Sequence, residues 1–311
     1  MALFEQKLQN IPKTLLKDKY GWPPFSVFNT MSWDWQRRKD EWENIGIYSA
    51  EGRDLNSNTN AVPTNTFSAR GRTAKTPEFV SKFDPYLCEL MYQWFSTDNM
   101  KILDPFAGGS VRGIVAAVLG RHYTGIDLSE KQIFSNEKQF KKILDSYTGI
   151  SGTVNWISGD SEEILKNLDV SYDMIFTCPP YYNLEKYSNN PKDLSNLVTY
   201  SEFLEKYKNI LELAEKRLAE NSFFVIVVSE IRNSENLANS EFYGFVPDTI
   251  KILQNCGLKY YNEIILQSNV GSLPIRAPRY FEDSRKIGRQ HQNILILYKG
   301  DITAIHDKFN G

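Results

Sequence analysis

The chain has 311 residues, of which 41% are apolar and 24% are charged. These fractions are typical of folded globular proteins and exclude collagen-like, disulfide-scaffold and wholly disordered classes. Its 36 Lys and Arg residues are balanced by 38 Asp and Glu residues, which gives a net charge of −2. A protein made only to coat nucleic acid is strongly basic, so any nucleic-acid contact is expected to be local.

Nothing in the sequence indicates a membrane or a metal. The apolar run from Phe223 to Val228 is far shorter than the ~20 residues of a membrane helix. The first residues have neither the apolar core nor the cleavage site of a signal peptide. Three scattered cysteines form no CxxC pair, which favours a reducing compartment and predicts no metal site. We therefore expect a cytoplasmic protein without a membrane partner.

Residues 1–80 differ in composition from the rest of the chain. They are rich in tryptophan and contain a polar tract at 52–77 that lacks any apolar period, which predicts a long loop. Trp35 and Trp42 lie seven residues apart, on one face of a helix, so packing against the main domain is favoured over an aromatic nucleic-acid surface. We interpret residues 1–80 as an N-terminal extension that could contact nucleic acid, and 81–311 as the main domain.

From residue 83 onward, apolar patterns of helix and strand type alternate. In chain order, they predict a helix at 83–95, a strand at 101–103, a helix at 110–119, a strand at 123–126, a helix at 129–144, a strand at 154–157, a short helix at 162–168, a strand at 174–177, a long helix at 200–218, a strand at 223–228 and a helix at 247–255. Such alternation predicts an α/β fold with a doubly wound, mainly parallel sheet.

The end of the chain breaks this alternation. Apolar runs at 260–266 and 293–298 are separated by a long basic loop without a convincing helix. We expect these two strands to form an antiparallel hairpin that closes one edge of the sheet.

Ligands of such sheets bind beyond the carboxyl ends of the strands, and three acidic residues follow consecutive predicted strands. Glycines after the first strand would let the backbone approach a ligand at a helix N-terminus. Asp127, 23 residues beyond Asp104, is placed to accept two ribose hydroxyls. Asp160 could accept from an adenine amino group or cap the next helix. The predicted cofactor-binding residues are Asp104, Pro105, Phe106, Ala107, Gly108, Gly109, Ser110, Asp127, Leu128, Asp160 and Ser161.

Three of the motifs resemble those of S-adenosylmethionine-dependent DNA methyltransferases that act on base amino groups. They are the run from Asp104 to Ser110, the Gly-Ile-Asp that ends at Asp127, and Cys178-Pro179-Pro180-Tyr181. Runs at 23–27, 110–114, 271–276 and 291–293 are similar to a phage-type DNA methylase family, over nearly the whole chain. The resemblance implies a class I methyltransferase (Rossmann-like) fold, S-adenosylmethionine as cofactor, double-stranded DNA with a flipped target base as partner, and the cytoplasm of a bacterial or phage-infected host cell.

The Cys178-Pro179-Pro180-Tyr181 motif carries the predicted chemistry. In the family, its first side chain and the first proline carbonyl accept the amino hydrogens, and its aromatic ring stacks on the base. Adjacent prolines fix the direction of that carbonyl. Here the first residue is Cys178, whose thiol is a weak acceptor. Cysteine is nearest in shape to serine, which favours cytosine N4 over adenine N6.

Three alternatives remain open at this point. Cys178 could attack C6 of cytosine as a thiolate, with Glu230 as helper, for methylation at C5. The usual Pro-Cys order of such enzymes is absent, since Thr177 precedes the cysteine. The chain could also methylate RNA, or bind nucleic acid without turnover.

Only 74 residues separate Asp104 from Cys178, which leaves no room between them for a recognition domain. Target contacts are therefore expected from residues 1–80 and from the basic loop at 270–290. The predicted DNA-binding residues of this loop, chiefly contacts to phosphates, are Arg276, Arg279, Arg285, Lys286 and Arg289. The sequence leaves the oligomeric state open.

Overall fold

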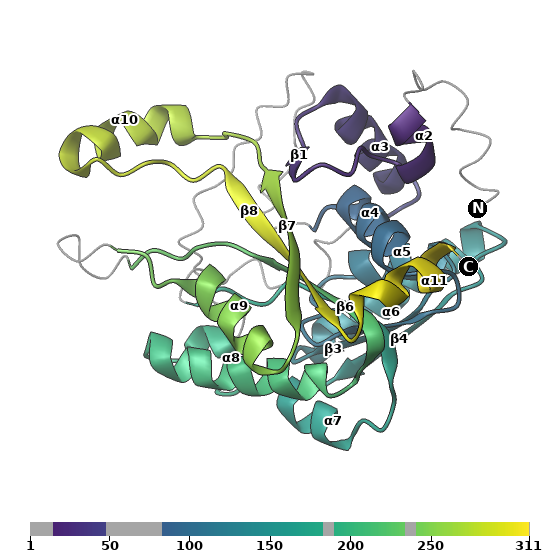
Figure 1. Cartoon of the computed structure of the whole chain (residues 1–311). Coiled ribbons are helices and arrows are strands. Elements are labelled where there is room, and N and C mark those ends of the chain that lie inside the picture. Colours follow the sequence, from purple (N-terminus) through teal and green to yellow (C-terminus); the bar gives the residue numbers. More distant parts are fainter. Residues whose placement is uncertain (1–14, 48–82, 183–189, 234–240, 311) are drawn as a thin grey trace.

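The computed structural model describes residues 15–47, 83–182, 190–233 and 241–310 (Figure 1). The predicted polar loop at 52–77 lies outside the described residues. In chain order, the strands are β1 (Val27–Asn29), β2 (Lys101–Asp104), β3 (His122–Asp127), β4 (Thr153–Ser158), β5 (Tyr172–Thr177), β6 (Leu218–Val228), β7 (Lys259–Gln267) and β8 (His291–Lys299). The α-helices are α2 (Leu15–Tyr20), α3 (Trp33–Glu43), α4 (Pro85–Phe95), α5 (Val111–Val118), α6 (Glu130–Ser146), α7 (Ser161–Asn167), α8 (Tyr200–Glu215), α9 (Phe245–Asn255), α10 (Leu273–Ser284) and α11 (Ile305–Asn310).

Within the described residues, the strands form one eight-stranded sheet in the order β1-β7-β8-β6-β5-β2-β3-β4. All neighbouring strands are parallel except β8, which runs antiparallel to both β6 and β7. The carboxyl ends of the parallel strands and the start of β8 therefore lie along one edge. The predicted doubly wound, mainly parallel α/β fold and the antiparallel β7–β8 pair are confirmed.

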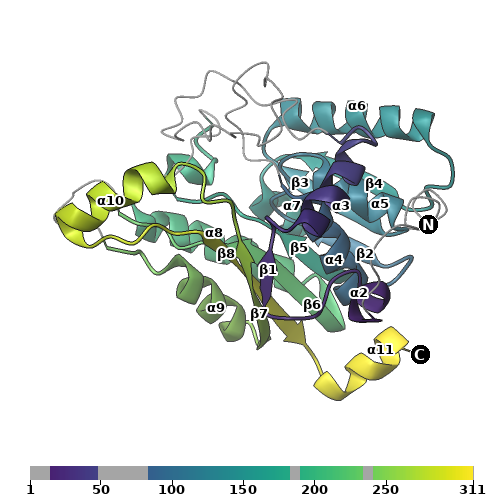
Figure 2. The ribbon, with the colours of Figure 1, turned by 90° about the horizontal axis from the view of Figure 1, so that it is seen from above.

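Alternate residues of the strands pack into two apolar layers. Val225 and Val227 of β6 face the layer that contains α4, α5 and α6. Phe224 and Ile226 face the opposite layer, which contains α7, α8 and α9. Figures 1 and 2 show these helices on opposite faces of the sheet. Burial of the central strands on both faces explains their nearly continuous apolar sequences.

The N-terminal segment 15–47 packs onto the main domain. Trp35 and Trp42 of α3 are completely buried, so the predicted packing of that face is confirmed. The Trp42 indole N–H donates to Glu89 of α4 at 2.7 Å, and Arg38 forms an ion pair with the same carboxylate at 2.5 Å. The indole N–H and the guanidinium together satisfy the buried carboxylate of Glu89, as a charge in an apolar layer requires.

Two elements differ from the expectation. β1, only three residues long, adds a strand outside β7 with Asn29 paired to Gln267, and it is too short to show a period of two. α10 occupies the loop that we expected to lack a helix. Pro278 inside this helix removes a backbone donor and suppresses the helical pattern in the sequence. No helix in the described ranges is long and apolar enough to cross a membrane.

Candidate functional site

Asp104 ends β2, and its carboxylate is completely buried. Its Oδ1 accepts from Thr177 Oγ1 at 2.6 Å and from the backbone N–H of Phe106 at 3.1 Å. Its Oδ2 accepts from Arg112 Nε at 2.5 Å and from the Tyr123 hydroxyl at 2.7 Å. The carboxylate therefore faces inward, and it can act on a bound ligand only through the turn that follows it.

Arg112 of α5 joins this carboxylate to the turn. Burial alone would lower the pKa of Arg112, but the charge of Asp104 outweighs it and holds the pKa above its ordinary value. The guanidinium Nη2 donates to the carbonyls of Phe106 at 2.6 Å and Ala107 at 3.0 Å. Burial and Asp104 also raise the pKa of Tyr123 well above its ordinary value, so its hydroxyl remains a donor.

The remaining carbonyls of the turn are also held by side chains. Ser161 Oγ of α7 donates to the carbonyl of Pro105 at 2.6 Å, and Asn136 Nδ2 of α6 donates to that of Gly108 at 2.8 Å. All four carbonyls from Pro105 to Gly108 thus accept from α5, α6 or α7. In the part of the chain that the structure describes, the N–H of Gly109 has no acceptor. The turn therefore directs its carbonyls into the protein.

Asp127 ends β3 beside the same turn. Its Oδ2 accepts the N–H of Gly108 at 2.9 Å, and its Oδ1 accepts the N–H of Ser129 at 2.8 Å. Gly108 has a φ of +52°, which glycine adopts without the strain of a side chain. Leu128, which is half-buried, follows directly. The structure therefore brings Asp127 and Leu128 to the turn at residues 105–109, here called the glycine turn.

Asp160 and Ser161 lie at the start of α7. Asp160 Oδ1 accepts the N–H of Glu162 at 3.0 Å, so the capping alternative is confirmed. Its Oδ2 lies 3.6 Å and 3.9 Å from the ammonium groups of Lys192 and Lys206. Ser161 is buried and holds the turn through its bond to Pro105.

Sequence reasoning missed a row of polar side chains on α6. Gln132, Asn136 and Gln139 are only 4%, 2% and 3% exposed. Gln132 Nε2 donates to Asn136 Oδ1 at 2.8 Å, and the Ser110 hydroxyl donates to the Gln139 amide oxygen. Their spacing of four and three residues places them on one helix face. Polar residues at that spacing on an otherwise inward face were the available signal.

The Cys178-Pro179-Pro180-Tyr181 motif follows β5, which pairs directly with β2 in the sheet. The two motifs therefore start from strand ends about 5 Å apart, and the bond from Thr177 to Asp104 links them. Cys178 is half-buried and packs against the apolar core. The Tyr181 hydroxyl accepts from Gln292 Nε2 at 2.9 Å. Its ring meets Phe245 edge to face, with 6.1 Å between the centroids.

Glu230, the predicted helper of the C5 alternative, lies just beyond β6. Its two carboxylate oxygens accept the N–H groups of Phe245 and Val246 at 3.1 Å and 3.0 Å. A carboxylate at a helix N-terminus satisfies donors that the helix leaves unpaired. Glu230 therefore caps α9.

A second polar network lies at the start of β8. Arg289 Nη2 donates to Asn293 Oδ1 at 2.5 Å, and its Nε donates to the carbonyl of His291 at 3.1 Å. Asn293 Nδ2 in turn donates to Glu263 of β7 at 2.5 Å. Burial and the charge of Arg289 lower the pKa of His291 below its ordinary value. Arg289, which we predicted to bind DNA, is thus part of the sheet edge. It lies near Gln292, whose side chain donates to the Tyr181 hydroxyl.

Residues 270–290, here called the arm, project from this edge (Figures 1 and 2). Its helix α10 has no buried residue. The Arg279 side chain is 85% exposed and lies 3.7 Å from Asp283. The Arg285 guanidinium lies 5.0 Å from the centre of the Phe281 ring, and Lys286 is half-buried. Arg276 is also half-buried, and its Nε has no hydrogen-bond partner in the described part of the chain.

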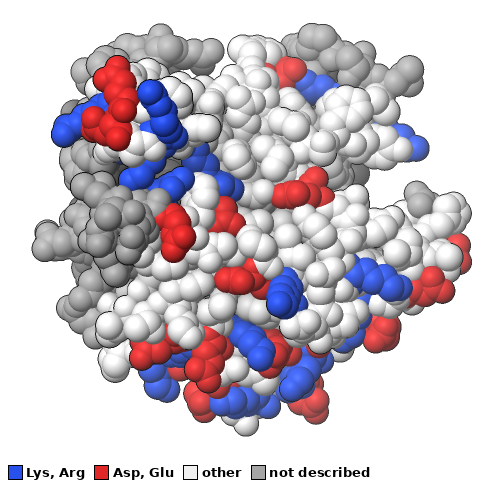
Figure 3. Space-filling model, turned by 60° about the vertical axis from the view of Figure 1, so that its left-hand side comes forward, with Lys and Arg blue, Asp and Glu red and all other residues white. Residues whose placement is uncertain are grey.

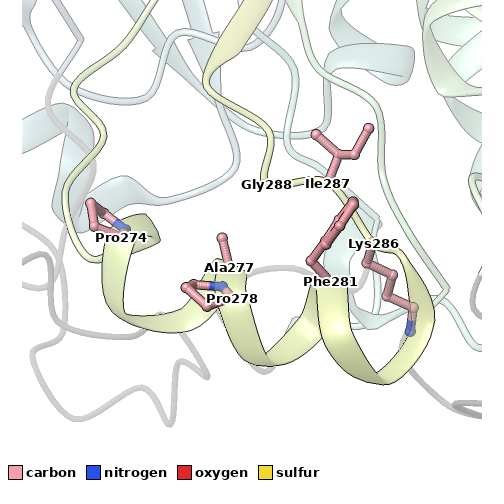
Figure 4. A pocket seen from close by; sticks show the side chains of 7 residues that line it. All are labelled: Pro274, Ala277, Pro278, Phe281, Lys286, Ile287 and Gly288. Carbon is pink, nitrogen blue, oxygen red and sulfur yellow. The ribbon is translucent and has the colours of Figure 1, made fainter.

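The returning segment of the arm, residues 285–290, packs against its helix. Figure 4 shows Phe281 and Ile287 beside each other in an open, mainly apolar depression of about 430 Å³. A Cβ added at Gly288 would lie 2.8 Å from the Leu273 side chain, so a larger residue there would have to displace the end of that side chain. Ile275 and Ile287 are more than four-fifths and about four-fifths exposed, respectively.

The charged surface is mixed. On the face shown in Figure 3, Lys and Arg side chains lie among Asp and Glu side chains. This agrees with the net charge of −2 and with the expectation that a nucleic-acid contact is local. No cluster of three or more potential metal ligands occurs among the described residues.

Comparisons with known proteins identify methyltransferases. No family model matches the chain. It is 28% identical over 145 residues to the type II beta methyltransferase M.BslI of Bacillus sp. (strain NEB-606), which covers 45% of this chain and 15% of that protein. The chain therefore spans a small fraction of the length of this curated relative.

Solved structures with a similar arrangement have low identity to the chain. TrmN from Thermus thermophilus has a TM-score of 0.44 and 15% identity, covering 70% of this chain and 49% of that one. A putative rRNA methylase from Clostridium thermocellum has a TM-score of 0.43 and 12% identity, covering 71% and 99%. Magnesium protoporphyrin IX methyltransferase from Synechocystis, solved with bound SAM, has a TM-score of 0.39 and 13% identity, covering 66% and 71%.

Proposed function

We propose that this chain transfers a methyl group from S-adenosylmethionine to an exocyclic amino group of a DNA base, cytosine N4 or adenine N6. The observation that carries the proposal is the hydrogen bond of 2.6 Å from Thr177 to Asp104. Asp104 directly precedes the glycine turn and Thr177 directly precedes Cys178-Pro179-Pro180-Tyr181, so this bond links the two motifs. The similarity to the type II beta methyltransferase M.BslI over 145 residues supports methyl transfer.

The glycine turn fits S-adenosylmethionine. Because its carbonyls point inward, the turn presents the N–H of Gly109, which has no acceptor among the described residues, and such a donor suits the carboxylate of an amino-acid tail. Asp127, fixed by Gly108 and Ser129, would accept the ribose hydroxyls. When bound, the cofactor supplies a methyl group already activated by its sulfonium.

The chain's own residues would orient the base. Gln292 and Phe245 fix the Tyr181 ring in one orientation, in which it can stack on a flipped base and offset part of the cost of unstacking. The Pro179 carbonyl and the Cys178 thiol would accept from the amino group. These two acceptors would hold the amino group with its nitrogen facing the methyl group that the cofactor would supply.

Glu230 has a structural role that does not depend on C5 methylation. In the C5 alternative, Cys178 is the nucleophile and Glu230 its helper. Both oxygens of Glu230 bind backbone N–H groups of α9, and this cap gives the carboxylate a structural role. Amino-group transfer requires no contribution from Glu230.

The arm is the proposed contact to duplex DNA. Arg279, Arg285 and Lys286 lie on a projection of the edge that carries Tyr181 (Figure 1). Phosphate contacts by such residues set affinity without reading sequence. An R279A/R285A variant should therefore bind duplex DNA more weakly, with a salt slope reduced by about 2.

The matched control for the arm is Lys141→Ala. Lys141 is 77% exposed and has an acidic partner four residues on, at 3.6 Å, as Arg279 has at 3.7 Å. It lies on α6, away from the arm in Figure 2. An unchanged salt slope in the arm variant, or an equal change in the control, would contradict the DNA contact.

Two substitutions separate the cofactor half of the site from the catalytic half. Asp127→Ala should weaken S-adenosylmethionine binding by more than about tenfold in titration calorimetry, because Gly108 also loses its acceptor. Tyr181→Ala should leave that affinity nearly unchanged and lower turnover. Asp169→Ala, an exposed carboxylate, is the control. Equal cofactor affinity in Asp127→Ala and wild type would refute the cofactor site.

A further inference from the structure

We infer that Asn136 of α6 is a positioning residue for cofactor binding, through its hold on the Gly108 carbonyl. The inference rests on the proposed function, because it concerns the turn assigned to S-adenosylmethionine. No motif of the sequence includes Asn136, which lies 28 residues beyond Gly108.

Hydrogen bonds hold both the N–H and the carbonyl of Gly108. Its N–H donates to Asp127 at 2.9 Å, and its carbonyl accepts from Asn136 at 2.8 Å. At a φ of +52°, glycine has access to many other conformations, so neighbouring groups must select this one. The Gly108 carbonyl belongs to the same peptide unit as the Gly109 N–H. Asn136 therefore sets the direction of the donor that we assign to the cofactor.

Asn136 is itself fixed by the polar row of α6. Its Oδ1 accepts from Gln132 at 2.8 Å, which directs its amide nitrogen toward Gly108. One turn further along, Gln139 accepts from the hydroxyl of Ser110, the residue that precedes α5. Both ends of the Gly108 to Ser110 segment are thus bound to one helix face.

The burial of this row supports a positioning role. Three amide side chains that are at most 4% exposed would be replaced at little cost by apolar residues if they served only to fill the interface. The bonds of Asn136 to Gly108 and of Ser110 to Gln139 instead fix one arrangement of the groups that they join. The groups joined here are α6 and the glycine turn.

The test is titration calorimetry with S-adenosylmethionine on the whole chain. Asn136→Leu keeps the size of the side chain and removes the donor. We expect its Kd to rise about tenfold, equivalent to about 1.4 kcal/mol. Affinity for duplex DNA should be unchanged. Under turnover conditions, KM for the cofactor should rise while kcat at saturating cofactor stays near the wild-type value.

The matched control is Asn167→Leu. Asn167 also donates its amide to a backbone carbonyl, that of Glu163 at 3.0 Å, but it is exposed at the end of α7. Its Kd should stay within about twofold of wild type. A second variant, Asn136→Asp, retains the shape and the acceptor for Gln132 and replaces the donor by a charged carboxylate oxygen that cannot bind the Gly108 carbonyl; it answers the question should Asn136→Leu fail to fold. It should also bind the cofactor more weakly.

The outcomes distinguish this inference from the proposed function. A folded Asn136 variant that binds S-adenosylmethionine as wild type does would overturn the positioning role alone. A lower unfolding midpoint with an unchanged Kd would have the same meaning, since it would show a structural role only. Failure of the wild-type chain to bind S-adenosylmethionine would overturn the proposed function itself.

Discussion

Asp104→Ala should destabilise the protein strongly, because it removes the acceptor on which a buried network converges. The Asp104 side chain is completely buried and has four donors around it. They are Arg112 Nε, the Tyr123 hydroxyl, Thr177 Oγ1 and the backbone N–H of Phe106. Alanine leaves all four without this partner.

The magnitude follows from the burial of Arg112, which is 5% exposed. Removing one partner of a buried ion pair costs about 3 to 5 kcal/mol, because the other charge stays in the interior. Unfolding free energies are about 5 to 15 kcal/mol, so the variant should remain folded but lose much of its stability. At about 2 °C per kcal/mol for a chain of this size, the unfolding midpoint should fall by about 6 to 10 °C.

Urea and thermal unfolding, followed by circular dichroism, measure this loss. The matched control is Asp145→Ala, which removes an ion pair of 3.6 Å to Lys141. Both side chains of this pair are exposed, 66% for Asp145 and 77% for Lys141, so its loss should cost less than about 1 kcal/mol. If Asp104→Ala lost no more unfolding free energy than the control, the role of Asp104 as the shared acceptor of this buried network would be refuted.

Three further expectations concern other parts of the molecule. Gln292→Leu should lower turnover and leave S-adenosylmethionine affinity unchanged, as calorimetry and single-turnover kinetics would show, because the Tyr181 hydroxyl loses its donor; equal turnover would contradict the positioning of the ring. Cys88 should resist alkylation by iodoacetamide in the native protein, since it is completely buried and burial raises the pKa of its thiol; rapid modification seen by peptide mass spectrometry would argue against this packing. Trp42→Phe should destabilise the chain by about 1 to 3 kcal/mol in urea unfolding, because Glu89 loses its indole donor; wild-type stability would show that this bond is not needed.

The main sheet was predictable because its elements are long and periodic. All seven predicted strands and all six predicted helices of the main domain are present, with shifted ends. For example, β6 begins at Leu218, before the predicted start at Phe223. The prediction began too late because Ala219 to Asn221 are small or polar and lack the apolar pattern of the later residues. The missed elements have local causes: β1 is too short for a period, and Pro278 masks α10.

The site was predictable only in outline. Motif positions at strand ends correctly brought Asp104, Asp127 and Cys178 to one edge of the sheet. The direction of each side chain depends on tertiary partners that the sequence does not reveal. The inward orientation of Asp104 follows from Arg112, and the position of Arg289 in the sheet edge follows from Asn293.

Label transfer from a deuterated-methyl cofactor tests the central claim most directly. Duplex DNA is incubated with the chain and the labelled S-adenosylmethionine, and its nucleosides are analysed by mass spectrometry, with single-stranded DNA and structured RNA in parallel. The account predicts label in N4-methylcytosine or N6-methyladenine, absent with Tyr181→Ala. Label in 5-methylcytosine would contradict it in favour of Cys178 as nucleophile. Label only in RNA, or none at all, would contradict the DNA substrate or the enzymatic activity.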